Sequence, residues 1–426
     1  MGLSESKAAS ARGATPPNEN QQKVEVEVPR EREYVHKEPV GVVVIGLGQR
    51  MCTLLRFLLL KHGRLVQIRA FCDDSPQAIQ QGLEHLKLVT DVDYSETVPT
   101  FTSHEELFAA GLDFTWVLIG SKNYLHKVHC VAAFEQGKHV FCEKPLATTL
   151  EDCVAIREAS QASGKLFSTG FVLRHASFYQ KIKEILDSGK LGRIVSVEAN
   201  ETLMPAHGGY IMRNWRRHRD QTGPHILEKC CHDIDILNWL LESLPSRVAS
   251  FAGLDIFVPE NKPPPEVSRA YRTWPAWEEV DPFDSDKDTE DNQVVIMEYR
   301  NKVRVTFHTN CNSALPERSL RIFGVKGALI GDLFTGKIKL CLVENDIVQA
   351  IRCRTGDLHG GADEIIVDDL VQSIDEETPP KASGEEGFRS AVVCLVIDQA
   401  RASGQVESLE QVWPRFGIDD DHHNEA

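Results

Sequence analysis

The sequence predicts an α/β protein in two parts. A doubly wound parallel sheet with crossover helices comes first, and an α+β domain with a large, mostly antiparallel open sheet follows. Two observations favour this fold class. Apolar strands alternate with helical patterns through about residue 172, which is typical of a parallel sheet covered by helices. After Gly192 the expected strands alternate apolar and polar residues, as at Val195, Val197 and Ala199, and alternation indicates one buried and one open face.

The length of 426 residues exceeds what a single core accommodates, so two domains with tails are expected. The composition predicts a disordered tail at 1–38 and an acidic tail at 417–426. The parallel sheet is expected at 39–170. The second domain is expected at 171–416, with an acidic, Pro-rich insertion at 259–292 that forms a long surface loop or a rim element.

The first strand, Val40–Ile45, is a run rich in valine and isoleucine, which indicates a strand buried on both faces. It leads into the turn GLGQR and a helix at 51–61. In this context glycine lets the backbone approach a dinucleotide pyrophosphate, whose charge is favoured at a helix N-terminus. The third glycine of this Rossmann fingerprint is absent, and Met51 takes its place. The residues expected to bind the cofactor here are Gly46, Gly48, Gln49 and Arg50.

The second strand, Val66–Cys72, ends at Asp73 and Asp74. An acidic residue here can accept hydrogen bonds from the adenosine ribose hydroxyls and would repel a 2′-phosphate. NAD is therefore favoured over NADP as the cofactor. The alternative is an ordinary turn, because the sequence DDSP is also a good helix start.

Polar residues follow two further strands of the predicted parallel sheet, Phe114–Ile119 and the strand that ends in HVFCEKP at 139–145. Ligands of such sheets bind outside the carboxyl ends of the strands. Lys144 therefore lies where it can point at a bound substrate, although a solvated surface lysine is the alternative. Helices at 129–136 and 149–164 and a strand at 166–172 complete this part. The residues expected around the cofactor at these strand ends are Ser121, Asn123, His126, Glu143 and Lys144.

A second group of reactive side chains lies at 227–235, in the sequence LEKCCHDID. If this segment is one helix, Glu228, His232 and Asp235 share a face. A carboxylate one turn from an imidazole orients it and raises its basicity, as general acid/base catalysis near neutral pH requires. The alternative is a helix start with favourable acids and a structural histidine. The residues expected to bind substrate are Arg174, Trp215 and Asp235, with Arg216 beside Trp215, and a rim is the alternative for the segment WRRHR.

The composition argues against several functional classes. Lys and Arg number 47 against 63 Asp and Glu, and the net charge of -16 argues against a nucleic-acid partner. No apolar run is long enough to span a membrane and no secretory signal is expected, so a cytoplasmic protein is predicted. The scattered cysteines are expected to be buried thiols, and no metal site is expected. The start MGLSES matches an acylation pattern at Gly2, for which a chance match is the alternative.

Taken together, these motifs resemble the Gfo/Idh/MocA oxidoreductase family. The resemblance covers about 39–416 and rests on GLGQR, CDD, EKP, GFVLRH, SGKLGRI, the segment with His232, and SGEEGFRSAVVCLVIDQA. It implies a Rossmann domain and an open-sheet domain with NAD or NADP between them. In this family, the motif EKP supplies a lysine and the pattern D-x-G-x-H-x-x-D supplies the other polar groups of the site. The resemblance implies that Lys144 matches that lysine, His232 the histidine of the pattern and Asp235 its last aspartate. The sequence departs from the family pattern where Glu228 replaces aspartate and Cys230 replaces glycine.

The implied activity is an NAD(P)-dependent dehydrogenase acting on a secondary alcohol of a sugar, polyol or related compound. His232 would take the hydroxyl proton, Lys144 would stabilise the growing charge on oxygen, and Glu228 would tune or orient one of them. Two alternatives remain: an NAD-dependent glycosidase acting through a transient keto sugar, and a non-catalytic dinucleotide-sensing protein. A homo-oligomer is expected, because an open sheet face leaves apolar surface that a second subunit covers.

Overall fold

The structure is a computed structural model that describes residues 34–36, 38–274, 280–356 and 358–418. Contacts between residues divide the chain into two units, Met1–Tyr34 and Val35–Ala426, and both sheets belong to the second unit. The acylation pattern at Gly2 and most of the predicted tails at 1–38 and 417–426 lie outside the described residues.

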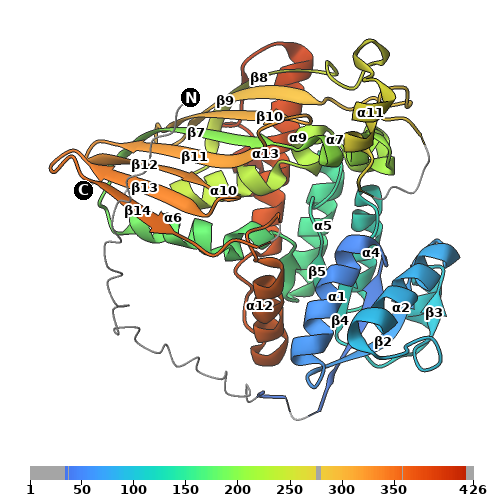
Figure 1. Cartoon of the computed structure of the whole chain (residues 1–426). Helices are drawn as coiled ribbons and strands as arrows, with labels where there is room; N and C mark the ends of the chain where they lie inside the picture. The colour runs from blue at the N-terminus through green and yellow to red at the C-terminus, as the bar shows by residue number, and fades with distance from the viewer. Residues whose placement is uncertain (1–33, 37, 275–279, 357, 419–426) are drawn as a thin grey trace, which may run out of the picture. The chain divides into compact units, whose positions relative to one another are not determined.

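The N-terminal part is a six-stranded parallel sheet with the strand order β3-β2-β1-β4-β5-β6 (Figure 1). This doubly wound order confirms the predicted Rossmann fold, and ligands of such sheets bind where the order reverses, beside β1 and β4. The elements are β1 (Val40–Ile45), α1 (Gln49–His62), β2 (Val66–Cys72), α2 (Pro76–Thr90), β3 (Thr100–Phe101), α3 (His104–Ala109), β4 (Trp116–Ile119), the 3-10 helix η1 (Asn123–Leu125), α4 (His126–Glu135), β5 (His139–Cys142), α5 (Leu150–Ser163) and β6 (Phe167–Thr169).

The strand predicted at 166–172 is shorter in the structure, because β6 ends at Thr169 and Val172–His175 forms the 3-10 helix η2. The chain turns at Gly170, where a Cβ atom would lie 2.4 Å from Oε2 of Glu143. Gly170 therefore gives the Glu143 carboxylate room at the end of the sheet.

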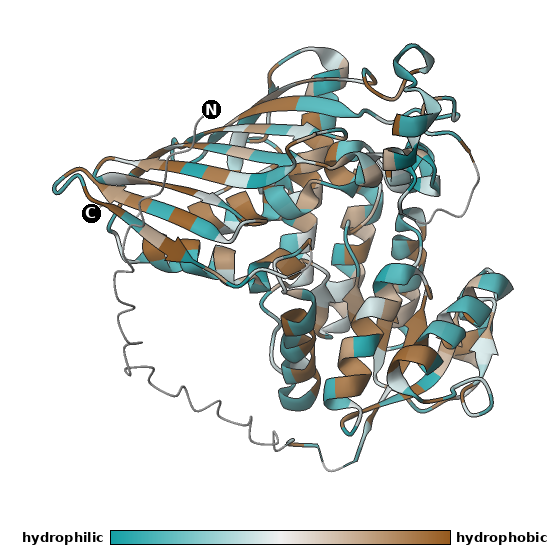
Figure 2. Ribbon diagram, in the orientation of Figure 1, coloured by the Kyte–Doolittle hydropathy of each residue, from teal (hydrophilic) through white to brown (hydrophobic). Residues whose placement is uncertain are grey.

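The second sheet has nine strands in the order β14-β13-β12-β11-β7-β10-β9-β8-β15, and β7 with β10 is its parallel pair. Its other pairs are antiparallel, as predicted. Figure 2 shows the alternation of hydrophobic and hydrophilic residues along these strands. The strands are β7 (Ile194–Thr202), β8 (Pro245–Gly253), β9 (Asn292–Tyr299), β10 (Arg304–Asn310), β11 (Glu317–Gly324), β12 (Gly327–Asp332), β13 (Lys337–Leu342), β14 (Val348–Arg352) and β15 (Glu407–Ser408).

One face of this sheet is buried and the other is open. Val295, Met297 and Phe307 point inward, whereas Val294 and Ile296 alternate with them and are exposed. The helices of this part are α6 (Ser177–Asp187), α7 (Pro205–Met212), η3 (Trp215–Arg217), α8 (Arg219–Thr222), α9 (His225–Glu228), α10 (Cys231–Leu241), η4 (Pro259–Asn261), α11 (Pro265–Ser268), η5 (Arg269–Tyr271), α12 (Asp363–Glu376), α13 (Gly384–Ser403) and η6 (Trp413–Phe416).

The last two long helices return to the parallel sheet. Figure 1 shows α12 beside α1, and their contact is apolar, with Leu54 and Leu58 of α1 near Ile366 and Leu370 of α12. α13 packs against α5, and Arg157 of α5 donates from Nε and Nη2 to the carboxylate of Glu385 at 2.7 and 3.2 Å. The helices of the first domain are therefore covered by the end of the chain.

The insertion predicted at 259–292 is not a plain loop. It contains η4, α11 and η5, and its last residue, Asn292, begins β9. Residues 275–279 of the insertion lie outside the described residues.

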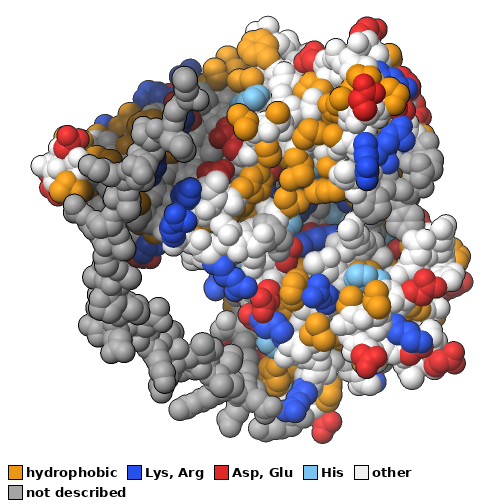
Figure 3. All heavy atoms as spheres, in the orientation of Figure 1, with side chains coloured by type: hydrophobic (Ala, Val, Ile, Leu, Met, Phe, Trp, Pro, Cys, Tyr) orange, Lys and Arg blue, Asp and Glu red, His pale blue; other side chains and the backbone are white. Residues whose placement is uncertain are grey.

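On the face drawn in Figure 3, acidic and basic side chains are interspersed. Within the described part of the chain, every helix is too short or too polar to span a membrane.

Candidate functional site

A cavity of about 920 Å³ is lined by residues of both sheet-containing parts. At one end it is bordered by the glycine turn after β1 and by Asp73 and Asp74 after β2. At the other end it is bordered by residues of α7, η3, α9 and α10. Of the residues predicted for the site, this cavity brings together Gly46, Gly48, Gln49, Arg50, Asp73, Ser121, Lys144, Trp215, Glu228 and His232.

The glycine turn fits a bound dinucleotide. Gly46 has φ +92°, and a Cβ atom there would lie 2.4 Å from the backbone of Gly120 and Ser121, so only glycine is accommodated. Gly48 precedes α1, and a Cβ atom there would meet nothing within 4 Å. The first turn of α1 has neither a side-chain cap nor an acidic residue. Its backbone N–H groups are therefore suited to binding a pyrophosphate.

The missing third glycine of the fingerprint is compensated at β4. Met51, which takes its place, is buried, and a Cβ atom on Gly120 would lie 2.9 Å from the terminal methyl group of Met51. The third glycine serves close packing of helix and strand. Here Gly120 provides the space from the strand side.

Asp73 is fixed at the end of β2. Its Oδ2 accepts from the backbone N–H of Leu47 at 2.8 Å, and its Oδ1 accepts from that of Ser75 at 3.0 Å. Burial raises the pKa of this carboxyl, although the two hydrogen bonds oppose that shift. The hydrogen bond to Leu47 connects the glycine turn to the acid expected to bind the ribose.

Three predicted cofactor-binding residues, Asn123, His126 and Glu143, lie outside the cavity lining. Asn123 donates from Nδ2 to the carbonyl oxygen of Thr222 at 3.2 Å. The two ring nitrogens of His126 lie 2.8 and 3.1 Å from the carbonyl oxygens of Pro145 and Ser121. These two side chains therefore hold the loops of the site together.

Glu143 forms part of a chain of charged groups at the start of α1. Arg50 donates from Nε to Oε1 of Glu143 at 2.8 Å and from Nη1 to Oδ1 of Asp363 at 2.5 Å. Nδ1 of His359 lies 3.0 Å from the same Asp363 oxygen. Burial alone would raise the pKa of Asp363, but His359 and Arg50 hold it well below its usual value. This network joins β5, α1 and α12 beside the cavity.

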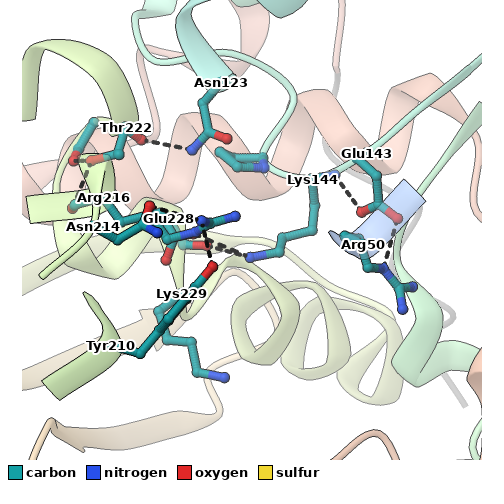
Figure 4. Close-up of polar contacts among 12 residues, drawn as sticks. Arg50, Asn123, Glu143, Lys144, Tyr210, Asn214, Arg216, Thr222, Glu228 and Lys229 are labelled. Atoms are coloured by element: carbon teal, nitrogen blue, oxygen red, sulfur yellow. Dashed lines mark hydrogen bonds and ion pairs between the residues drawn. The ribbon is translucent and has the colours of Figure 1, made fainter. Parts of the chain in front are cut away.

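Lys144 points toward Glu228 across the cavity, as Figure 4 shows. Its Nζ donates to the backbone oxygen of Glu228 at 2.6 Å and lies 3.8 Å from carboxylate Oε1. Arg216 donates from Nε to the same Oε1 at 3.0 Å. Burial alone would raise the pKa of Glu228, but Lys144 and Arg216 outweigh it and lower the pKa to about 2. Glu228 is therefore a carboxylate that holds two cations in place.

His232 is buried and lines the cavity. Its ring lies edge-on to Phe171 at 5.8 Å and tilted to His359 at 5.8 Å, measured between centroids. Burial, followed by the charge of Lys144, lowers the pKa of His232 well below its usual value. The imidazole is therefore neutral at neutral pH, and its basicity is lowered, whereas the sequence predicted that a neighbouring carboxylate raises it.

Two predicted substrate-binding residues, Arg174 and Asp235, do not line the cavity. Nε and Nη2 of Arg174 each donate to Asp235 at 2.8 Å, and both side chains are buried. The predicted single helix with Glu228, His232 and Asp235 on one face is wrong, because α9 ends at Glu228 and α10 begins at Cys231. Asp235 thus forms a structural ion pair with Arg174.

Cys230, which stands where the family pattern has glycine, has φ -96° between these two helices. This backbone conformation admits a side chain, so the departure imposes no strain. Among the described residues, no group of three or more His, Cys, Asp or Glu side chains is arranged to hold a metal ion.

Several residues that line the cavity were not predicted from the sequence: His207, Tyr210, Lys229, Trp274, His359 and Asp363. His359 precedes two glycines at a helix start, in HGGADE, and that context is a signal in the sequence. Trp274 lies in the insertion, and its position in the sequence does not indicate that it reaches the cavity.

Comparison with known proteins agrees with this architecture. The sequence model of the C-terminal α/β domain of an oxidoreductase family matches residues 183–408, which is more than half of the chain. The description of the same family's NAD-binding Rossmann fold matches residues 40–171.

Individual relatives match this chain at low sequence identity or over only part of its length. 1,5-Anhydro-D-fructose reductase of Ensifer adhaerens is 25% identical over 319 residues, which cover 72% of this chain and 84% of that protein. Inositol 2-dehydrogenase 3 of Saccharopolyspora erythraea is 38% identical over 138 residues, 30% of this chain and 36% of that protein. The solved structure of a levoglucosan dehydrogenase with NADH and levoglucosan shows the same fold, with a TM-score of 0.71 at 17% sequence identity. The match covers 88% of this chain and 100% of that chain. The chain therefore belongs to the Gfo/Idh/MocA oxidoreductase family, as a dehydrogenase whose N-terminal domain is an NAD-binding Rossmann fold.

Proposed function

We propose that the protein oxidises a secondary alcohol of a sugar, polyol or related compound with NAD. The observation that carries this proposal is that Lys144 and His232 line the same cavity as the glycine turn. An ammonium group, a neutral imidazole and the glycine turn thus share one cavity. The names of the relatives, an anhydrofructose reductase and an inositol dehydrogenase, support the substrate class.

In the proposed reaction, NAD held by the glycine turn and Asp73 would supply the acceptor for the hydride of the carbinol carbon. His232 accepts the hydroxyl proton, for which its neutral state is required. Lys144 donates a hydrogen bond to the same oxygen and stabilises the negative charge that grows on it. Glu228 acts through Lys144 and Arg216 as a positioning residue, because its carboxylate stays ionised and lies within 3.8 Å of Nζ and 3.0 Å of Nε.

The decisive experiment incubates the purified protein with NAD or NADP and a panel of sugars, polyols and glycosides. Reduced nicotinamide is followed by absorbance, and free glycone is measured in the same samples. The proposal expects NADH to form with at least one sugar or polyol. Release of glycone without net NADH would instead identify a glycosidase acting through a keto sugar, and absence of both products would contradict the proposal.

The preference for NAD over NADP is expected to depend on the charge of Asp73. Asp73→Asn keeps the shape of the side chain but removes the charge that would repel a 2′-phosphate. We expect the ratio of kcat/KM for NAD to that for NADP to fall about 10-fold or more. Asp74→Asn is the matched comparison, since Asp74 also lines the cavity. An unchanged ratio in Asp73→Asn would contradict this role of Asp73.

The open sheet face supports a homo-oligomer. Phe251 of β8 pairs with Val294 of β9, and their exposed fractions are 73% and 45%. Ile296, two residues further along β9, is 55% exposed. A contiguous apolar patch of this kind is commonly covered by a partner. Light scattering is expected to give a multiple of the 47.7 kDa chain mass for the wild type and a smaller particle for Phe251→Asp with Ile296→Asp. A monomeric wild type would refute this assignment.

A further inference from the structure

The insertion at 259–292 contributes Trp274 to the lining of the cavity. Phe257 and Phe283, near its two ends, are buried in a cluster with Ile211 and Met212 of α7. The base of the insertion is closed by Asp291, whose carboxylate accepts from the backbone N–H groups of residues 255, 256 and 257 at 2.8, 2.9 and 2.7 Å. The insertion is therefore packed against α7 and fixed at its base.

Two adjacent glycines in α7 allow this close packing. A Cβ atom on Gly208 would lie 1.8 Å from the carbonyl oxygen of Cys311, and one on Gly209 would lie 2.1 Å from that of Tyr271. Glycine destabilises a helix interior by about 1 kcal/mol relative to alanine, so a glycine pair in this helix requires a packing reason. Gly209 allows direct contact between the backbone of α7 and that of the insertion at Tyr271, and Gly208 allows the same contact with Cys311, which follows β10.

The same contact positions Trp274. Its carbonyl oxygen accepts from Nη2 of the buried Arg213 at 2.8 Å. Its ring faces His207 with a centroid distance of 4.6 Å and an interplanar angle of 33°, and it meets Tyr210 edge-on at 5.9 Å. All three rings line the cavity. The insertion thus supplies one member of a continuous aromatic surface.

This aromatic surface adjoins the proposed acid/base groups. Nη1 of Arg216 donates to the hydroxyl of Tyr210 at 3.0 Å, and Nε of Arg216 donates to Glu228, as Figure 4 shows. Glu228 in turn holds Lys144. Burial, followed by the charge of Lys229, lowers the pKa of His207 well below its usual value, so this ring is also uncharged at neutral pH. Tyr210 is thus linked through Arg216 and Glu228 to Lys144, and His207 and Trp274 line the same cavity as His232.

We propose that His207, Tyr210 and Trp274 form a stacking subsite for the apolar C–H face of a pyranose ring, so that the substrate is a cyclic sugar and not an open-chain polyol. The inference deepens the function proposed above and rests on it. Aromatic rings offer an apolar face together with a polar edge, and a pyranose has the complementary combination of C–H faces and equatorial hydroxyls. An open-chain polyol has no rigid face to lie against Trp274.

The test measures binding without requiring turnover. Saturation-transfer difference NMR is recorded on the protein with NADH and matched ligand pairs, methyl glucoside with sorbitol and methyl mannoside with mannitol. We expect the glycosides to bind, with the strongest transfer at C–H protons on one ring face, and the acyclic partners to bind more weakly. Trp274→Ala is expected to weaken glycoside binding about 10-fold, whereas Trp274→Phe retains most of it.

The controls separate this inference from the proposed function. Phe57 is a partly exposed aromatic residue on α1 that does not line the cavity, so the Phe57→Ala variant should bind glycoside as the wild type does. The affinity for NADH and the melting temperature should be equal in all variants. Equal glycoside binding by Trp274→Ala and wild type, or equal binding of cyclic and acyclic ligands, would overturn the subsite. Glycoside binding that depends on Trp274 but yields no NADH from NAD would preserve the subsite and reject the dehydrogenase reaction.

Discussion

Replacing Lys144 with alanine is expected to lower kcat by about 10²- to 10⁴-fold, since one positioned charge donor to the reacting oxygen contributes on that scale. The side chain extends from the end of β5 and is held by Glu228, so its loss removes a preorganised positive charge. Initial rates at saturating NAD and saturating substrate measure the effect. The binding of NADH, followed by fluorescence, should change far less than kcat.

A matched control for this variant is Lys127→Ala, because Lys127 is exposed on α4 and does not line the cavity. It should keep the wild-type rate. A Lys144→Ala enzyme with full kcat would show that the oxygen of the substrate is stabilised by another group.

Replacing His232 with asparagine should also lower kcat by about 10²- to 10⁴-fold, and it should change the pH dependence of the rate. Burial and Lys144 lower the pKa of this imidazole. In the wild type His232 therefore stays unprotonated, and remains available as the proton acceptor, at pH values below the usual histidine range. In the wild type the oxidation rate is therefore expected to fall only at acidic pH. In the variant the remaining rate should rise steadily with pH, because solvent must take the proton.

The measurement is a profile of kcat for alcohol oxidation between about pH 5 and pH 9. His85→Asn is the control, since His85 is exposed on α2 and distant from the cavity lining. Parallel pH profiles for His232→Asn and the wild type would reject His232 as the proton acceptor.

The parallel sheet could be predicted from the sequence because its signals are local. A buried strand, the turn GLGQR and a helix follow one another within about twenty residues, and each residue type is required where it stands. The structure explains why the incomplete glycine fingerprint still works, since Gly120 leaves space for Met51. That compensation joins α1 to the end of β4 and was not visible in either segment alone.

The segment around His232 was predicted less well. Helical spacing placed Asp235 beside Glu228 and His232, but the helix is interrupted at residues 229–230 and Asp235 pairs with Arg174. Spacing predicts a shared face only within one uninterrupted helix. The partner of a buried acid comes from tertiary packing, which short-range patterns do not contain.

The residues that were missed come from segments far along the chain. Trp274 reaches the cavity because the insertion packs on Gly209 of α7, and His359 reaches it because the chain returns to α1 through α12. Both depend on long-range contacts. The composition of the insertion indicated a surface loop or a rim element, but it did not indicate that Trp274 would line the cavity.

The return of α12 and α13 to the first sheet has a practical consequence for engineering. Leu54 and Leu58 of α1 are covered by side chains that lie some three hundred positions later, and Asp363 neutralises Arg50 at the coenzyme turn. A hybrid made by joining the first 170 residues to the remainder of a relative would meet foreign helices at both contacts. Exchange of the nucleotide half between such enzymes therefore has to transfer the closing helical pair as well, so the transplantable module is discontinuous in the gene.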